Sequence, residues 1–239
     1  MSFIRKMKKV LSNKKYRENP DPENLSQERL AALSVGAINS EQTCYYCDSL
    51  TTGEEVCEIK GNLENFYDIT DHDSAIETLD WLFERGHRVY FDAIKAIYAG
   101  RGEGIDYSRF TEEDQANFME YLMNMQGVLP LLVQEGYFSG NIFDLANVSI
   151  VAWDMGRLVM VTRSCYDSGY IDEEEAWKYI ENAYKACKEV YADWDEFAKG
   201  YVFGRAMWSG DAQFLLGIMG IAERLLADEK SPWKRVSLQ

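Results

Sequence analysis

The segment from Val148 to Val161 constrains the fold more than any other part of this sequence. Its apolar residues are spread around the whole circumference of a helix and leave no polar face: Ile150, Val151, Ala152, Trp153, Met155, Leu158, Val159, Met160 and Val161. A helix that is apolar on every side is buried on every side. The segment therefore predicts a central helix that other helices enclose.

Two charged residues, Asp154 and Arg157, lie in the middle of this apolar segment. An unpaired ion in a protein interior costs several kcal/mol even after the surroundings relax. Each of the two side chains therefore needs a buried partner. They are three positions apart, a spacing at which side chains on one helix can meet.

A second segment, residues 194–208, carries a stripe of residues at helical spacing: Trp194, Phe197, Tyr201, Gly204, Arg205 and Trp208. Arg205 falls inside this stripe and is expected to face the core. Gly156 and Gly204 each precede an arginine, and glycine inside a helix indicates close packing because it weakens the helix itself. We expect the two helices to cross at these glycines and Asp154 to bridge Arg157 and Arg205.

The polar cluster of Asp154, Arg157, Arg163, Tyr201 and Arg205 has two interpretations. The favoured one is a structural network of satisfied ions, because such networks resemble functional sites. The other is a pocket for a carboxylate or phosphate. There the three arginines would bind the anion, Asp154 would act as acid or base, and Tyr201 would donate a hydrogen bond.

Four of the six tryptophans lie between residues 153 and 208, in or beside distinctive motifs. The predicted aromatic framework consists of Trp153, Trp177, Trp194, Trp208 and Trp233. The motifs are WDMGR at 153–157, GYIDEEEAW at 169–177, WDEFAKGYVFGRAMW at 194–208 and SPW at 231–233. As a set they resemble the bacterial domain-of-unknown-function family twelve-sixty-six.

The N-terminal half resembles the same family more loosely, through Leu33–Ala37, Asp48–Leu50 and Leu82–Arg88. The likeness extends from about Leu25 to Trp233. This family carries no established activity, so the resemblance implies a fold unit without implying a reaction.

The charge of the chain is unevenly distributed. The net charge is −15, but the first seventeen residues carry seven Lys or Arg and no acid, which leaves −22 on the remainder. An acidic body does not suit general nucleic-acid binding, which needs a basic footprint. It would suit a basic protein partner, whose association would be sensitive to salt.

The sequence predicts an all-α fold in two parts. Residues 1–22 form a basic arm and linker, and residues 23–239 form a single domain of roughly eight helices around the buried segment 148–161. Residues 1–17 place apolar side chains on one helical face, a pattern typical of a helix that contacts a membrane surface or a partner. A frayed basic tail is the favoured alternative.

Local signals fix several helix starts. Asp71 or Asp73, Thr111 and Asp172 are expected to cap helices, and Gly86 is expected to end one. The helix that follows Gly86 is predicted to open at His87-Arg88 and to reach about Ala99. A kink or break is expected near Pro130.

No metal site or cofactor is expected. Cys44 and Cys47 form a CxxC pair with Cys57 ten residues on, but neither of the two histidines has a zinc-ligand spacing. His87 is expected to be an ordinary interhelix histidine, because no nucleophile is paired with it in the sequence. Five cysteines without an export signal or a membrane-spanning stretch indicate reduced thiols and a cytoplasmic location.

Three functional hypotheses follow. The favoured one is a non-catalytic interaction protein whose acidic surface binds a basic partner, such as a toxin that it neutralises. The second is an enzyme or small-anion binder that uses the arginine cluster. The third is a peripheral membrane protein that attaches through residues 1–17.

Overall fold

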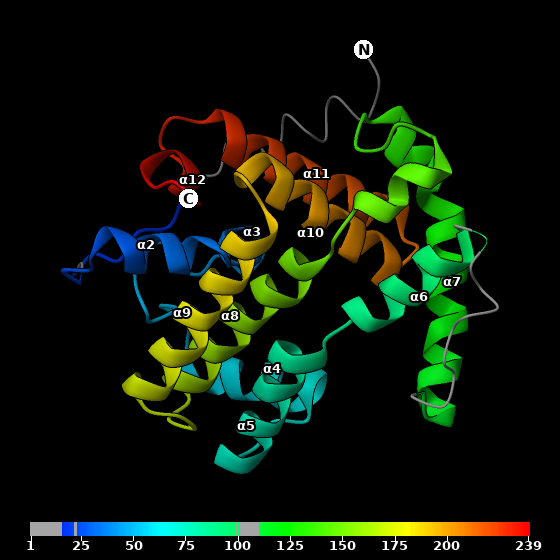
Figure 1. Cartoon of the computed structure of the whole chain (residues 1–239). Coiled ribbons are helices and arrows are strands. Elements are labelled where there is room, and N and C mark those ends of the chain that lie inside the picture. The colour runs from blue at the N-terminus through cyan, green and yellow to red at the C-terminus, as the bar shows by residue number, and fades with distance from the viewer. Residues whose placement is uncertain (1–15, 22, 99, 101–109) are drawn as a thin grey trace.

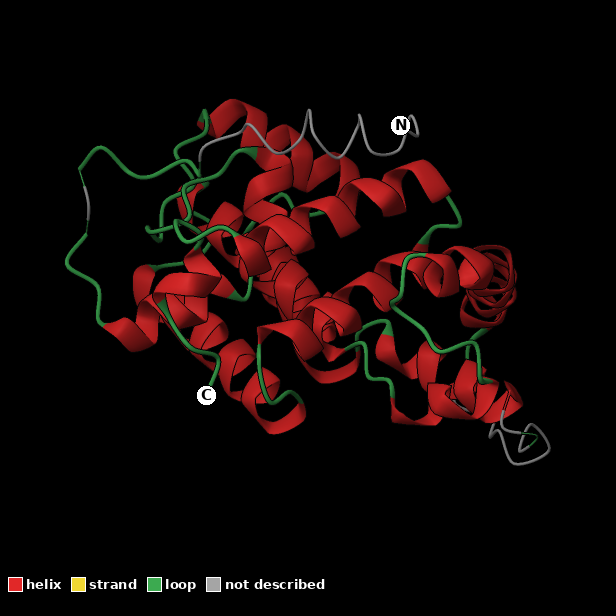
Figure 2. Ribbon diagram, turned by 90° about the horizontal axis from the view of Figure 1, so that it is seen from above, coloured by secondary structure: helices red, strands yellow, loops and turns green. Residues whose placement is uncertain are grey.

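The computed structural model describes residues 16–21, 23–98, 100 and 110–239. All regular secondary structure in these ranges is helical, which confirms the all-α prediction (Figure 2). The predicted basic arm lies outside the described residues except for Tyr16–Asp21. There, Tyr16 is buried and the Arg17 guanidinium donates to the Cys44 and Gly53 carbonyls. This described part of the expected arm and linker is therefore attached to the body.

Helix α8, Val151–Asp167, occupies the centre of the fold, and α9, Glu173–Val190, and α10, Trp194–Trp208, pack against it (Figure 1). The predicted central helix is thus confirmed with shifted ends. It continues past Val161 because the polar side chains of its last turns, Thr162, Arg163 and Ser164, are buried.

The residues before α8 are fixed by side chains from other helices. The Tyr191 hydroxyl accepts from the Ala152 N–H at 2.9 Å and donates to the Ser149 carbonyl at 3.0 Å. The Lys95 ammonium donates to the Val148 carbonyl at 2.9 Å. Because these backbone groups already have partners, the helix begins at Val151 rather than at Val148.

The N-terminal half supplies short helices, most of them in the lower and left parts of Figure 1 and the last of them at the right. They are α2 (Gln27–Ser34), α3 (Ala37–Thr43), α4 (Val56–Tyr67), α5 (His72–Asp80), the π-helical turn η1 (Trp81–Arg85) and α6 (Arg88–Tyr98). Asp71 caps α5 through a capping box with Ser74, as the sequence predicted. Gly86 follows η1 with φ +60°, in the left-handed region that favours glycine.

The remaining helices are α7 (Glu112–Gln134), the 3₁₀ turn η4 (Ile142–Asn147), α11 (Ala212–Ala227) and α12 (Pro232–Arg235). Thr111 forms the predicted capping box of α7, and the predicted cap Asp172 forms a capping box with Glu175 in α9. No break occurs at Pro130, because α7 runs through it to Gln134. Figure 1 shows α7 at the right edge of the molecule, with α6 beside it.

Helices α8 and α10 cross at the two glycines that precede arginines, as the sequence predicted. A Cβ on Gly204 would lie 2.2 Å from the Trp153 Cβ, and a Cβ on Gly156 would lie 2.8 Å from Tyr201 Cε2. Each glycine therefore makes room for an aromatic residue of the other helix. This exchange brings Trp153 and Tyr201 into edge-to-face contact at 5.2 Å.

Candidate functional site

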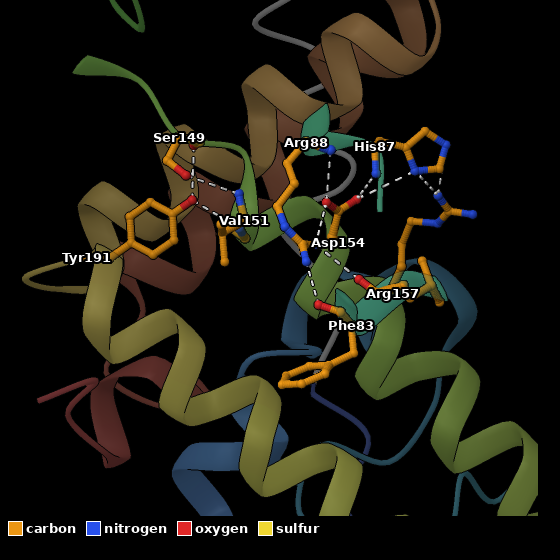
Figure 3. Close-up of polar contacts among 10 residues, drawn as sticks. Phe83, His87, Arg88, Ser149, Val151, Asp154, Arg157 and Tyr191 are labelled. Atoms are coloured by element: carbon orange, nitrogen blue, oxygen red, sulfur yellow. Dashed lines mark hydrogen bonds and ion pairs between the residues drawn. The ribbon is translucent and has the colours of Figure 1, made fainter. Parts of the chain in front are cut away.

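The carboxylate of Asp154 caps the N-terminus of α6. It accepts hydrogen bonds from the His87 N–H at 2.8 Å, the Arg88 N–H at 3.1 Å and the Arg88 guanidinium at 3.1 Å, and it is fully buried (Figure 3). Helix N-termini leave N–H groups without intrahelical partners and favour negative charge. A residue of the central helix thus satisfies a helix end 66 positions away in the sequence.

The bridge predicted from Asp154 to Arg157 and Arg205 is wrong. The oxygens of Asp154 are occupied by groups from the start of α6, and Arg157 contacts the ring of His87 instead. The correct cation is Arg88, which also donates to the carbonyls of Leu82 and Phe83. The sequence signal that pointed to it was the Leu82–Arg88 segment, because glycine, histidine and arginine follow one another at a helix start.

Arg157 and His87 form the next contact in this network. Arg157 Nη1 lies 3.1 Å from His87 Nδ1. His87 Nδ1 also lies 3.5 Å from Asp154 Oδ1, so the ring stands between a cation and a carboxylate. Burial lowers the pKa of His87, as does the positive charge of Arg157, while the neighbouring Asp154 opposes the shift. Trp81, 5.1 Å away, packs edge-on against the His87 ring.

Arg163 is sealed inside the protein and fully bonded. Its guanidinium donates to the carbonyls of Leu50, Tyr46 and Thr51 at 3.2, 2.7 and 2.8 Å, and to the Ser40 hydroxyl at 3.0 Å. Burial lowers its pKa to about 10. Arg163 therefore fastens the 46–51 loop to α8 and is not available to bind an anion, contrary to the second interpretation of the cluster.

Arg205 has a different environment. It is 6% exposed, and its guanidinium forms no hydrogen bond or ion pair with the described residues; Nη1 is buried without a partner. Its carbon Cζ lies 5.0 Å from the Trp208 ring centroid and 5.6 Å from that of Phe214. Burial lowers the pKa of Arg205, against the influence of Tyr201 and Asp211. Arg205 thus faces two aromatic rings rather than a carboxylate.

Arg157 and Arg205 line the same cavity, which has a volume of about 460 Å³. Helices α3, α4, α8, α10 and α11 contribute to its wall. This volume lies within the roughly 300–1,000 Å³ range of small-molecule sites. We call it the arginine cavity.

The arginine cavity carries positive charge without an acidic group in its described lining. Trp208 lies within cation–π distance of both guanidiniums, at 6.0 Å from Arg157 and 5.0 Å from Arg205. Two neighbouring cations that lack a carboxylate partner repel each other in a medium of low dielectric constant. The electrostatics of the cavity therefore favour an anion.

Asp154 and Tyr201, like Arg163, do not line the cavity. Tyr201 is fully buried, which raises the pKa of its hydroxyl against the opposing influence of Arg157 and Asn39. The roles suggested for them, acid or base and hydrogen-bond donor to a ligand, therefore have no geometric basis here. The cavity instead includes Asn39 and Trp153 beside the two arginines, and sequence reasoning missed Asn39.

The tryptophan framework divides into structural and cavity residues. Trp194 stacks on Trp233 at 5.2 Å, and their indole N–H groups donate to the Val236 and Ser34 carbonyls. Trp177 is buried beneath the Arg29 guanidinium. Trp153 and Trp208 line the cavity, and Trp208 is 40% exposed. Trp233 is therefore packed against the body of the protein.

Neither a metal cluster nor a membrane span emerges from the described ranges. No three His, Cys, Asp or Glu side chains there are placed to hold a metal ion. None of the described helices combines the length and the apolar character needed to cross a bilayer.

Comparison with known proteins identifies the family. A search of curated proteins and a search of solved structures each give no match. The family model described as "Protein of unknown function (DUF1266)" matches residues 62–238, which include α8, α10 and Trp233. Because this match covers well over half of the chain and confirms the resemblance seen in its motifs, the protein belongs to the DUF1266 family.

Proposed function

We propose that this protein binds a small organic anion in the arginine cavity, with Arg157 and Arg205 as the groups that recognise the negative charge. The observation that carries the proposal is the state of Arg205. It is more than nine-tenths buried, it lines a cavity, and it has no counter-ion among the described residues. A structural arginine in such a position would be expected to look like Arg163, which forms a hydrogen bond at each of its three guanidinium nitrogens.

The physical argument rests on the cost of burying charge. A buried ion without a partner costs several kcal/mol, so a fold retains one only where something offsets that cost. An anionic ligand between the arginines would supply the missing hydrogen bonds and the opposite charge. Guanidinium groups suit carboxylates and phosphates because their fork of N–H donors matches two oxygens at once.

Arg157 is suited to the same role through its own contacts. His87 holds one side of its guanidinium through a single hydrogen bond, and the Trp153 ring lies 5.2 Å from its Cζ. Arg157 is therefore oriented by groups that are neutral or aromatic and keeps its full charge for a ligand.

We propose that the protein binds the anion and does not transform it. Asp154 and His87, the titratable groups closest to Arg157 in this network, are buried and engaged with each other and with the start of α6. Neither belongs to the lining of the cavity.

Thermal denaturation with propionate or inorganic phosphate as the probe tests the proposal. We expect either anion to raise the Tm of the full chain in a saturable manner, because a ligand that binds only the native state stabilises it. Arg157→Gln and Arg205→Gln should each abolish the shift. Arg29→Gln is the matched control, because Arg29 also lies over a tryptophan ring, at 4.2 Å, but outside the cavity.

A Tm that does not respond to any anion, or responds equally in the Arg205→Gln variant, would refute the proposal. The basic protein partner expected from the acidic body, the cytoplasmic location and the membrane contact through residues 1–17 stay predictions, since no described contact tests them.

A further inference from the structure

The rim of the arginine cavity carries three large hydrophobic side chains that are unusually exposed. Phe66 of α4 is 75% exposed, Phe214 of α11 is 62% exposed and Trp208 of α10 is 40% exposed. They come from three helices that are distant in the sequence, yet they surround one opening. Exposed apolar groups gathered at a cavity, rather than scattered singly, mark a surface that is covered by something.

The wall behind the rim is mostly apolar. Leu63, Met160 and Val161 contribute to it, beside the rings of Tyr67 and Trp153, and the polar residues Asn39, Gln42, Thr43, Asn62 and Ser164 also line the cavity. The arginines are the only charged groups in the described lining, so one anionic head group matches the charge of the cavity, and the apolar part of the wall and rim can pack against hydrocarbon.

The absence of an acidic side chain from the described lining also limits the ligand. An ammonium group placed there would meet two guanidiniums and no carboxylate. Amino acids and other zwitterions are therefore disfavoured. A molecule with one anionic head and an uncharged body fits better, because the head can contact the arginines and the body can contact the apolar wall and rim.

We infer that the ligand of the arginine cavity is an amphipathic anion, with a carboxylate or phosphate head at Arg157 and Arg205 and an apolar tail that leaves over Phe66, Trp208 and Phe214. This inference rests on the proposed function and specifies its ligand class. The rings of Trp208 and Phe214 cover the Arg205 guanidinium in the structure, and the same rings line the path of the tail.

Calorimetric titration of the full chain with decanoate and decyl phosphate tests the inference, with propionate and inorganic phosphate as probes that offer the head alone. Each methylene group transferred out of water improves affinity about fourfold. We expect at least one decyl probe to bind on the order of tenfold or more tightly than its head-only counterpart. Comparison of the two decyl probes identifies the head group that the arginines accept.

Substitutions at the rim distinguish the contribution of the apolar tail to affinity from that of the anionic head. Phe66→Ser combined with Phe214→Ser should reduce decyl affinity roughly tenfold. Phe66→Ser alone should weaken decyl binding and leave the head-only affinity unchanged, because Phe66 is 75% exposed and its ring is not among those that lie over Arg157 or Arg205. Phe143→Ser is the matched control, since Phe143 is 69% exposed and lies outside the cavity. Decyltrimethylammonium, which carries the same tail and the opposite charge, should not bind.

The outcomes distinguish the inference from the function on which it rests. If decyl and head-only probes bind equally well and depend on Arg205, the cavity binds a small hydrophilic anion and the inference about the tail is wrong. If no anion binds, both the inference and the proposed function are wrong. If Phe143→Ser weakens binding as much as the double variant, or the cationic probe binds equally, the decyl chain adsorbs without selection and the inference is overturned.

Discussion

The carboxylate of Asp154 and the α-carbon of Gly86 approach so closely that a Cβ on Gly86 would lie 2.3 Å from Asp154 Oδ2. The backbone of Gly86 also has a φ of +60°. The central helix and the start of α6 can meet only because this position has no side chain. The WDMGR motif and the Leu82–Arg88 segment are therefore two halves of one junction.

The Gly86→Ala substitution should destabilise the protein by about 2 kcal/mol or more. Alanine would have to adopt a positive φ, and its Cβ would clash with the buried carboxylate of Asp154. Chemical denaturation measures this change. Gly217→Ala is the matched control, because Gly217 lies inside α11 and a Cβ there would meet nothing within 4 Å. The control should stabilise the protein by about 0.5–1 kcal/mol through helix propensity. Equal effects of the two substitutions would contradict the role given to Gly86.

The Asp154→Asn substitution should destabilise the protein by about 3–5 kcal/mol, because it leaves Arg88 without a counter-ion at a buried junction. The amide would also present N–H groups to the N–H groups of His87 and Arg88. Asp195→Asn removes a carboxylate from an exposed pair with Lys199 and should cost about 0.5 kcal/mol or less. Urea denaturation of both variants gives the comparison, and a loss below about 1 kcal/mol in Asp154→Asn would show that the junction is not held by this charge.

Two buried arginines should respond in opposite ways to the same substitution. Arg163→Met strands the carbonyls of Leu50, Tyr46 and Thr51 and should cost about 3–5 kcal/mol. Arg205→Met removes an unpaired charge and should leave stability within about 0.5 kcal/mol of wild type or raise it. If Arg205 lowers the stability of the ligand-free protein, its retention is expected to serve function rather than folding. A large loss of stability in Arg205→Met would indicate a structural role instead.

The only two histidines of the chain should titrate on opposite sides of the ordinary pKa of about 6.5. Hydrogen bonds to Glu175 and Asp73 raise the pKa of His72, and burial lowers that of His87. Proton–carbon correlation spectra across a pH series measure both values. At any pH between the two pKa values, we expect His72 to be charged to a greater extent than His87. A His87 pKa at or above that of His72 would contradict the buried placement of the ring.

These shifts also have opposite consequences for stability. Because the pKa of His87 is lower in the folded than in the unfolded chain, its contribution is fully present above about pH 6.5 and is lost as the pH falls below that value. His72, with a raised pKa, contributes stability below about pH 6.5 that is lost as the pH rises through its folded pKa. The His87→Asn variant should therefore lose less stability than wild type between about pH 7.5 and about pH 5.5, as thermal unfolding at both pH values would measure. An unchanged difference would show that folding does not lower the pKa of His87.

The sequence by itself determined the features that depend on neighbouring residues. The helix caps at Thr111 and Asp172, and a third at Asp71 or Asp73, were predictable because a cap depends only on residues within three positions of it. The buried central helix followed from its apolar circumference. The crossing of α8 and α10 was predictable from Gly156 and Gly204, because a glycine inside a helix usually indicates that another helix packs closely against it.

The tertiary structure alone decided which charges are paired. Asp154 pairs with Arg88 rather than with Arg157, although Arg157 is only three positions away in the sequence. The fold places the N–H groups of the α6 N-terminus, which lack intrahelical partners, beside the Asp154 carboxylate. Arg163 and Arg205 look alike in the sequence, yet one is surrounded by carbonyls of a folded loop and the other by aromatic rings at a cavity. Pairing between distant residues depends on how whole helices pack, and that information is spread over the entire core. The arginine cavity is the clearest case, since five helices must assemble before it exists.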